Sequence, residues 1–364
     1  MKKSLMSNYT LFNREIKKND KFTEKLRNFI RVPAFQYILF GVVMCIVGFL
    51  AIEKVLPYSW QSAFATTFAY AIASIGFCLL MGYSGLASLG TGGFIGIGTY
   101  AVHYILVEAK LPFFVALLVA ILVSVLIGLI VGFISLRIEG IYLVILTLAL
   151  SEILRTLYAA IEPKLALYSK DAVLFGMKWP TSMSLVLVTV FLVIIMIITS
   201  NLINSPTGRA MLAMKNSTAA AQAMGISLIK YRLMSFVICT AYASVTGVLL
   251  MMVVRSADAT DPTGYYALIT SLNILAAVII GGFKSIWGAV FGTFVMFGIK
   301  TVIFNQIPLL AKNATIIPLA SGILVIVIAM FYPGGLAQLL VELKGKIKTL
   351  AKKIKEDKYG KDLG

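Results

Sequence analysis

The chain has 364 residues, of which 60% are apolar and 13% are charged, and its mean hydropathy is +0.94. A soluble domain carries roughly 25% charged residues, so this composition excludes an ordinary soluble protein and indicates an integral membrane protein. The formal net charge of +17 does not point to nucleic acid, because nine of the 32 basic residues lie in residues 1–31 and eight lie in residues 344–361. Basic residues beside apolar spans mark the cytoplasmic side and attract anionic lipids.

Apolar runs of about 20 residues, the length that crosses the hydrocarbon core of a bilayer, recur along the chain. We therefore predict an all-α integral membrane protein with about ten transmembrane helices. Both basic ends are predicted to be cytoplasmic, which requires an even number of spans. The predicted spans are residues 34–56, 62–81, 92–107, 113–136, 141–160, 183–202, 232–254, 266–283, 286–304 and 315–332.

Three parts follow from this pattern. Residues 1–33 form a basic cytoplasmic arm, residues 34–332 form the polytopic domain, and residues 333–364 form a basic tail. Leucines and isoleucines recur in the tail at alternating spacings of four and three, with lysines between them. This pattern predicts an amphipathic helix on the inner leaflet, and a coiled coil is the competing interpretation.

Residues 82–101, GYSGLASLGTGGFIGIGTYA, contain seven glycines and four serines or threonines between two apolar runs. Non-helical backbone at membrane depth is tolerated only where protein buries it or where it lines a watery cavity, and glycine suits such a segment. We predict a broken or re-entrant segment next to the translocation path. The alternative is tight helix packing through small residues. The predicted path residues here are Gly82, Ser84, Gly85, Ser88, Gly90, Thr91, Gly93, Gly96 and Gly98.

Few ionisable or metal-binding side chains lie in the spans. Glu152 and Arg155 are three residues apart and can neutralise each other on one helical face; Glu152 is also a candidate for a path or gating role. His103 is interpreted as a packed or pore-lining residue, with a proton carrier as the alternative. The three cysteines lack metal or redox spacing, so no metal site and no catalytic residue is predicted.

Residues 204–231 form the longest predicted internal connection. Ser205 followed by Pro206 is typical of a helix start, and Asn216 or Ser217 is expected to cap a second short helix that ends at Gly225. The second helix would expose Ala220, Ala223 and Met224, which fit a groove on another protein. A solvated linker is the alternative.

Four blocks together resemble the LivM-like permease subunits of branched-chain amino acid ABC importers. They are residues 82–101, residues 136–155 (LRIEGIYLVILTLALSEILR), residues 205–226 (SPTGRAMLAMKNSTAAAQAMGI) and residues 279–292 (IIGGFKSIWGAVFG). They occur in the family order. Two positions depart from the family pattern: Thr91 replaces a frequent histidine, and Lys284 replaces a glycine.

The resemblance implies a permease that works with a second related permease, two cytoplasmic ATPase subunits and an extracellular or periplasmic solute-binding protein. It implies that residues 204–230 are the coupling loop, which docks on the ATPase. The positions expected to serve this coupling are Ser205, Pro206, Gly208, Arg209, Ala220, Met224 and Gly225. Localisation in a bacterial cytoplasmic membrane is expected.

The sequence contains no G-x-x-x-x-G-K-[ST] phosphate-binding loop, so ATP is expected on partner subunits and no cofactor on this chain. Branched-chain amino acids are the default cargo, while a nucleoside, urea or a short amide stays open. An ion-coupled secondary transporter is the second functional class, which would normally carry a lone acid at mid-bilayer. An enzyme is not expected, because no acid pair or nucleophile–base set is evident.

Overall fold

The computed structural model describes residues 33–52, 58–135, 140–167, 173–174, 177–178, 183–262 and 264–303, with a few positions between 322 and 336. The helices are α2 (Pro33–Ile52), α3 (Tyr58–Tyr83), α4 (Thr91–Val102), α5 (Phe113–Ser135), α6 (Ile141–Ile161), α7 (Ser184–Asn204), α8 (Pro206–Asn216), α9 (Thr218–Ala223), α10 (Leu228–Val254), α11 (Leu268–Gly281) and α12 (Ile286–Thr293). Two of them continue as π-helices, α4 into η1 (His103–Glu108) and α12 into η3 (Phe294–Ile303).

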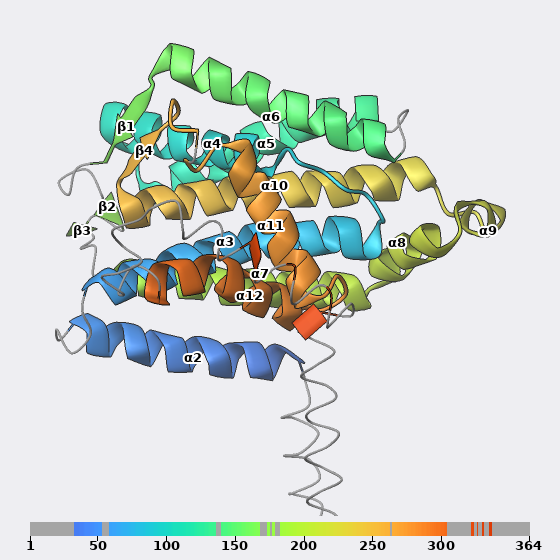
Figure 1. Ribbon diagram of the computed structural model, residues 1–364, viewed down its shortest axis with the longest axis horizontal. Helices are drawn as coiled ribbons and strands as arrows, with labels where there is room; N and C mark the ends of the chain where they lie inside the picture. Colours follow the sequence, from blue (N-terminus) through green and yellow to red (C-terminus); the bar gives the residue numbers. More distant parts are fainter. Residues whose placement is uncertain are drawn as a thin grey trace, which may run out of the picture.

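The long helices lie side by side along the longest axis of the molecule (Figure 1). Helices α8 and α9 lie at one end of this bundle, and the short strands lie at the other. Strand β1 (Lys164–Ala166) pairs antiparallel with β4 (Ser256–Asp258), and β2 (Val173–Leu174) pairs with β3 (Met177–Lys178). The strands were not predicted, since they are only two or three residues long.

Composition explains which helices are central. Helix α3 is rich in alanine, serine and glycine, and its buried residues include Ala65, Ala69 and Ala73. Small side chains let neighbouring backbones approach, as is typical of helix contacts inside membranes. Helix α5 instead carries Leu, Ile and Val on most positions, and large side chains such as Leu126 and Ile130 are exposed. Helix α3 therefore lies in the core, whereas α5 presents an apolar outer face.

The predicted all-α membrane architecture is confirmed, but the count of ten spans is not. Nine predicted spans coincide with helices, and the tenth, residues 315–332, falls almost wholly outside the described residues. Six described helices are long and apolar enough to cross a membrane, namely α2, α3, α5, α6, α7 and α10. Helix α11 has 14 residues, which at 1.5 Å per residue gives about 21 Å, less than the hydrocarbon thickness.

The predicted internal connection, residues 204–231, and the short strands lie at opposite ends of the bundle (Figure 1). The segment 204–231 and the turn at Lys284 both lie near the end of α3. Lys215 donates to Met81 O and Gly82 O of α3, and Tyr83 of α3 donates to Lys284 O. Asp258 lies at the strand end, in β4. The N-terminal arm and the C-terminal tail fall outside the described residues apart from single positions, so their predicted side and amphipathic helix stay predictions.

Candidate functional site

The glycine-rich stretch divides into three parts. Helix α3 ends at Tyr83, residues 84–90 are non-helical, and α4 begins at Thr91. The predicted interruption is therefore present, and it is shorter than the glycine pattern suggests. Ser88, Leu89 and Gly90 are buried, so this backbone reaches α4 inside the protein.

Hydroxyl groups from two other helices bond the buried amides around the start of α4. Leu89 N donates to Thr147 Oγ1 (3.0 Å) and Gly93 N donates to Ser151 Oγ (2.9 Å), both on α6. Gly92 N donates to Ser271 Oγ of α11 (2.8 Å). The first amides of a helix have no partner within the helix, and a buried amide without any partner is costly. These hydroxyls take the place of an N-cap side chain, because the N-cap residue, Gly90, has no side-chain acceptor.

Sequence reasoning missed these hydroxyls. Thr147 and Ser151 are four residues apart in an otherwise apolar helix, so they lie on one face of α6. That spacing was a usable signal for a polar contact on this face. Ser271 has no comparable pattern around it, and only packing reveals its partner.

The glycines of α4 are explained by close packing, the alternative that the sequence left open. A Cβ at Gly98 would overlap the carbonyl oxygen of Ser244 in α10, and a Cβ at Gly247 would overlap that of Ile95 in α4. The same atom at Gly96 would overlap the ring of Tyr158. Packing thus accounts for Gly96 and Gly98, while the predicted path role of the stretch stays a prediction.

The remaining residues predicted for the path are distributed along the same stretch. Gly82 lies in α3 against the carbonyl of Phe283, and Gly85 has φ +73° and lies next to Lys215. Thr91 and Ser84 are buried. The structure therefore keeps Gly82 to Gly98 together as one continuous, mostly buried stretch.

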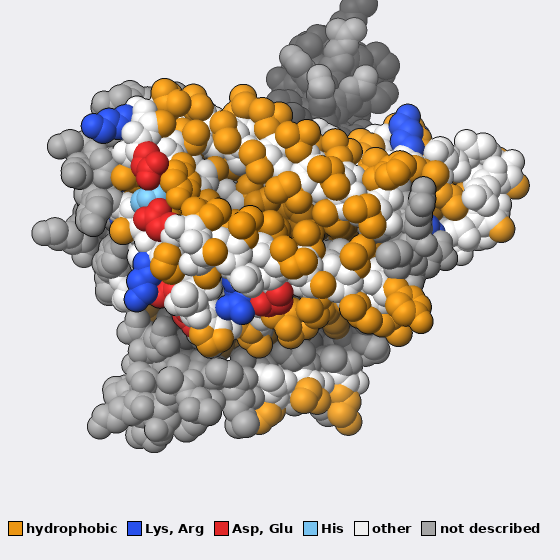
Figure 2. All heavy atoms as spheres, turned by 90° about the horizontal axis from the view of Figure 1, so that it is seen from above, with side chains coloured by type: hydrophobic (Ala, Val, Ile, Leu, Met, Phe, Trp, Pro, Cys, Tyr) orange, Lys and Arg blue, Asp and Glu red, His pale blue; other side chains and the backbone are white. Residues whose placement is uncertain are grey.

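Glu152 does not join that stretch. Helix α6 turns Thr147 and Ser151 toward α4, whereas Glu152 and Arg155 are 35% and 28% exposed and form an ion pair of 2.9 Å from Nε to Oε2. A shallow hollow next to them is lined by Glu152, Ile153, Thr156, Leu157 and Ala160. Figure 2 views the bundle from the side of α6, and hydrophobic side chains cover most of that face. The pair thus lies on an otherwise apolar outer surface.

The predicted pair of capped helices is present as α8 and α9. The Ser205 hydroxyl accepts from Gly208 N (3.4 Å) with Pro206 in the first turn, and the Ser217 hydroxyl accepts from Ala220 N (3.2 Å). Ser217, not Asn216, is the second cap. These two caps fix where each helix begins.

The second helix ends as predicted. Gly225 has φ +76° and donates to Gln222 O (2.9 Å), and Ile226 N donates to Ala221 O (3.0 Å). This is the Schellman pattern of a helix that ends on a left-handed glycine. Both bonds are local in sequence, which is why the sequence was sufficient to predict them.

One face of the α8–α9 pair is buried and the other is open. Met211 and Met214 of α8 are buried, and a Cβ at Gly208 would overlap the carbonyl of Ile203 in α7. The Arg209 guanidinium donates to Asn204 O (3.1 Å). On the open face Ala220 and Ala223 are exposed and Met224 is 82% exposed. The predicted small apolar surface therefore exists at this end of the bundle.

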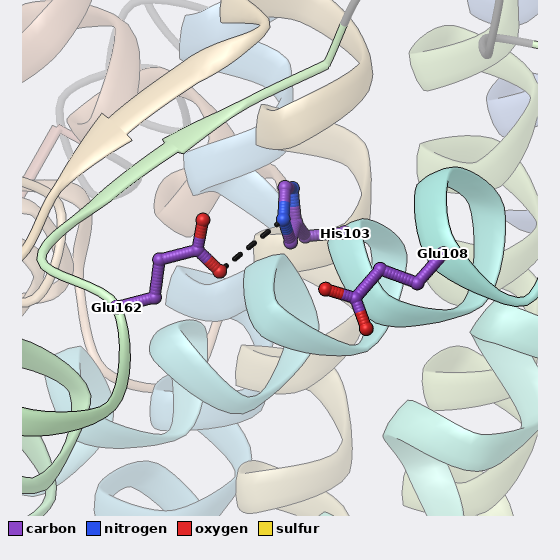
Figure 3. A group of neighbouring side chains, drawn as sticks. All are labelled: His103, Glu108 and Glu162. Atoms are coloured by element: carbon purple, nitrogen blue, oxygen red, sulfur yellow. Dashed lines mark ion pairs between the residues drawn. The ribbon is translucent and has the colours of Figure 1, made fainter.

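A second polar group lies at the strand end, where His103 points between two carboxylates (Figure 3). His103 Nε2 lies 3.3 Å from Glu162 Oε2, and Glu108 lies close enough that all three donor atoms are within 4.8 Å of one another. The π-helix η1 contributes His103 and Glu108, five residues apart. Tyr100 and Tyr104 also donate to Glu162. We interpret the group as a structural polar contact that joins Glu162, at the C-terminus of α6, to η1.

Two comparisons relate this chain to known proteins. A family model described as the permease component of the branched-chain amino acid transport system matches residues 61–331. The proteins named "High-affinity branched-chain amino acid transport system permease protein LivM" of Salmonella typhimurium and Escherichia coli are each 28% identical over 248 residues, which cover 60% of this chain and 57% of each relative. The chain thus spans little more than half the length of these relatives.

A "Probable branched-chain amino acid transport permease protein LivH" of Methanocaldococcus jannaschii is 32% identical over 150 residues, covering 41% of this chain and 44% of the relative. No solved structure matches. The family match covers the glycine-rich stretch, α6, the α8–α9 pair and the turn at Lys284.

Proposed function

Since this chain belongs to the family of permease components of branched-chain amino acid transport systems, we propose that it is a transmembrane permease subunit of an ABC importer. With a second permease it would form the path for branched-chain or related amino acids. The observation that carries the proposal is the α8–α9 pair, two capped helices at one end of the bundle with a small exposed apolar face.

The energy for transport is proposed to come from two ATPase subunits that dock on α8 and α9. The sequence has no phosphate-binding loop of its own, so ATP is proposed to bind the partner subunits, and no cofactor is proposed for this chain. Ala220, Ala223 and Met224 would fit a groove on the ATPase. Gly208 keeps α8 close to α7, and Arg209 bonds the end of α7, so movement of the pair would reach the membrane helices.

The second permease is proposed to cover the outer face of α6. Ionisable side chains in membrane spans almost always face protein or a watery cavity, but Glu152 and Arg155 lie near the middle of α6 on its outer face. A neighbouring permease would keep this ion pair out of lipid. The path would then pass between the two chains, with Glu152 at its wall.

The solute-binding protein is proposed to deliver cargo at the strand end, opposite α8 and α9. In this orientation both termini are cytoplasmic, in a bacterial inner membrane, and their basic residues contact anionic lipids. Cargo selection is left to the binding protein, so nucleosides, urea or short amides are the alternatives to amino acids. An ion-coupled carrier is disfavoured because Arg155 pairs with the one acid that lies on the outer face of α6.

The proposal is tested with the purified complex of both permeases and both ATPases in proteoliposomes, with the binding protein and leucine. We expect ATP-dependent uptake that requires every subunit. Gly225→Val should uncouple ATP hydrolysis from uptake, because a side chain in the left-handed region costs about 1–2 kcal/mol and displaces the junction of α9 and α10.

Gly225→Asn is the matched control, since asparagine visits this conformation more readily and should retain most of the uptake. Co-purification of the ATPases with Gly225→Val shows that the complex still assembles. Uptake by this chain alone along an ion gradient, or unchanged uptake by Gly225→Val, would contradict the proposal.

A further inference from the structure

Lys215 connects the α8–α9 pair to the end of α3. It lies in the last turn of α8, and its Nζ donates to the carbonyl oxygens of Met81 (3.1 Å) and Gly82 (2.8 Å). These partners are more than 130 residues away in sequence. These two bonds join α8 directly to a membrane helix that is distant from it in sequence.

The chemistry of this contact is that of a helix C-terminus. The last carbonyls of a helix lack partners within the helix and carry a partial negative charge, so a cation is favoured there. Burial lowers the pKa of the Lys215 ammonium, and the Lys284 ammonium nearby lowers it further. The carbonyl oxygens of Met81 and Gly82 offset part of the free-energy cost of burying the charged ammonium, because hydrogen bonds from a charged donor are stronger than neutral ones.

The contact lies where α3 gives way to the non-helical segment 84–90. The Lys215 side chain also lies against Gly85, where a Cβ would come within 3.2 Å of Lys215 Cγ. At the same end of α3, Cys78 Sγ donates to Phe283 O (3.1 Å) and Tyr83 donates to Lys284 O (3.1 Å). The end of α3 thus bonds both α8 and the α11–α12 turn.

From this point the chain leads directly to the buried start of α4. Residues 89–93 are fixed to α6 and α11 by the hydroxyls of Thr147, Ser151 and Ser271. Buried Met211 and Met214 give α8 an apolar contact that tolerates sliding, whereas two directed bonds from one ammonium fix its position on α3. A displacement of α8 would therefore act on the end of α3 and on segment 84–90.

We propose that Lys215 is the positioning residue that transmits movement of the α8–α9 pair to segment 84–90 and so to the start of α4. This inference rests on the proposed function, because it assumes that ATPase subunits move α8 and α9. It assigns the step inside the membrane domain to one side chain that the family resemblance did not single out.

The first test compares Lys215→Met with Lys215→Arg in the complete complex with binding protein in proteoliposomes. Methionine keeps the apolar stem but loses both bonds, so uptake per ATP hydrolysed should fall about tenfold or more, while ATP hydrolysis stays within about twofold. Arginine keeps the donors and should retain most of the coupling. Leu126→Met, at an exposed residue of α5 far from the coupling loop in sequence, is the control and should change neither rate.

The second test measures the movement itself with a nitroxide label in the same complex. A label at Ala87 reports on segment 84–90, and a label at Ala223 reports on α9. ATP should change both spectra in the wild-type complex, and Lys215→Met should abolish the change at Ala87 only. An equal ATP-dependent change at Ala87 in Lys215→Met would overturn the inference.

The remaining outcomes are also decisive. If Lys215→Met lowers hydrolysis and uptake in proportion, or releases the ATPases on purification, Lys215 only stabilises the fold and the inference is wrong. If the wild-type complex shows ATP-dependent label changes but no uptake of any amino acid, the proposed cargo is wrong and the transmission stands. If neither label responds to ATP in the wild type, the proposed ATPase coupling itself fails.

Discussion

Two glycines bring the central helices into backbone contact. Gly98 of α4 lies against the backbone of α10 at Ser244 and Val248, and Gly247 of α10 lies against Ile95 of α4. The two glycines approach each other, since a Cβ at Gly98 would lie 3.0 Å from the Cα of Gly247. Interiors at this density have no room for an additional methyl group, so both positions require glycine.

We predict that Gly98→Ala destabilises the protein by about 1–3 kcal/mol or prevents its folding, because overpacking against rigid backbone forces the helices apart. Melting of the detergent-solubilised protein, followed by size-exclusion chromatography after heating, measures the effect. Gly322→Ala is the matched control, since no atom lies within 4 Å of the Cβ that it would add. Equal melting of the two variants would contradict the packing explanation.

Helix α4 begins inside the protein and depends on other helices for its first hydrogen bonds. Its N-cap position is Gly90, which has no side-chain acceptor. Ser151 and Ser271 supply the acceptors instead, from α6 and α11. The start of α4 thus ties three helices together, and its stability is a property of the assembled bundle.

We predict that Ser151→Ala and Ser271→Ala each lower the free energy of unfolding by about 1–3 kcal/mol, because each leaves a buried amide without an acceptor. The double variant should approach the sum of the two, since each serine serves a different amide. Ser124→Ala is the control. The hydroxyl of this buried serine donates to Ile121 O in its own helix, so removing the hydroxyl leaves no backbone amide without an acceptor. Denaturant unfolding in mixed micelles provides the measurement, and equal effects of all three single variants would refute the cap role.

The described residues expose more apolar surface than a protein in water tolerates. The surface along α6 differs, because it also carries a charged pair. The large side chains that α2 and α5 expose are hydrophobic, among them Ile46 and Leu126, except for Gln36 in the first turn of α2. Helix α6 exposes Ile153 and Leu157 together with the Glu152–Arg155 pair. Lipid suits the first two surfaces, whereas a charged pair favours a protein neighbour.

We predict that a benzophenone amino acid at Thr156, exposed beside the ion pair, forms a covalent product with the second permease on illumination of native membranes. The same residue at Leu126, 60% exposed on α5, should give no such product, because it faces lipid. Mass spectrometry of the product identifies the partner. A permease product from Leu126 and none from Thr156 would show that the chains meet along another helix.

Much of the fold could be predicted from sequence because its patterns are local. Nine predicted spans correspond to helices, since each span is read from one continuous apolar run. The hydrogen bonds at the Ser205 and Ser217 caps and at the left-handed Gly225 join residues only three to five positions apart, so the α8–α9 pair was predicted nearly to the residue. The count of ten spans was not confirmed, because α11 is short and the last predicted span lies outside the described residues.

The candidate site was harder to predict because its contacts are distant in sequence. Composition could not decide whether Gly96 and Gly98 break a helix or pack one, since both uses require a missing side chain. Only the approach of Tyr158 and Ser244 identifies packing. In the same way, the spacing of Glu152 and Arg155 predicts their pairing but not that the pair faces outward.

By itself, the sequence determined the membrane environment, the helical class, the order of the helices and the capped pair between α7 and α10. These depend on hydrophobic runs and on hydrogen bonds between near neighbours. Only the tertiary structure decided which hydroxyls serve the buried amides of α4, which face of α6 is open and which carbonyls Lys215 reaches. Those partners lie 58 to 179 residues apart, and helix packing alone brings them within bonding distance.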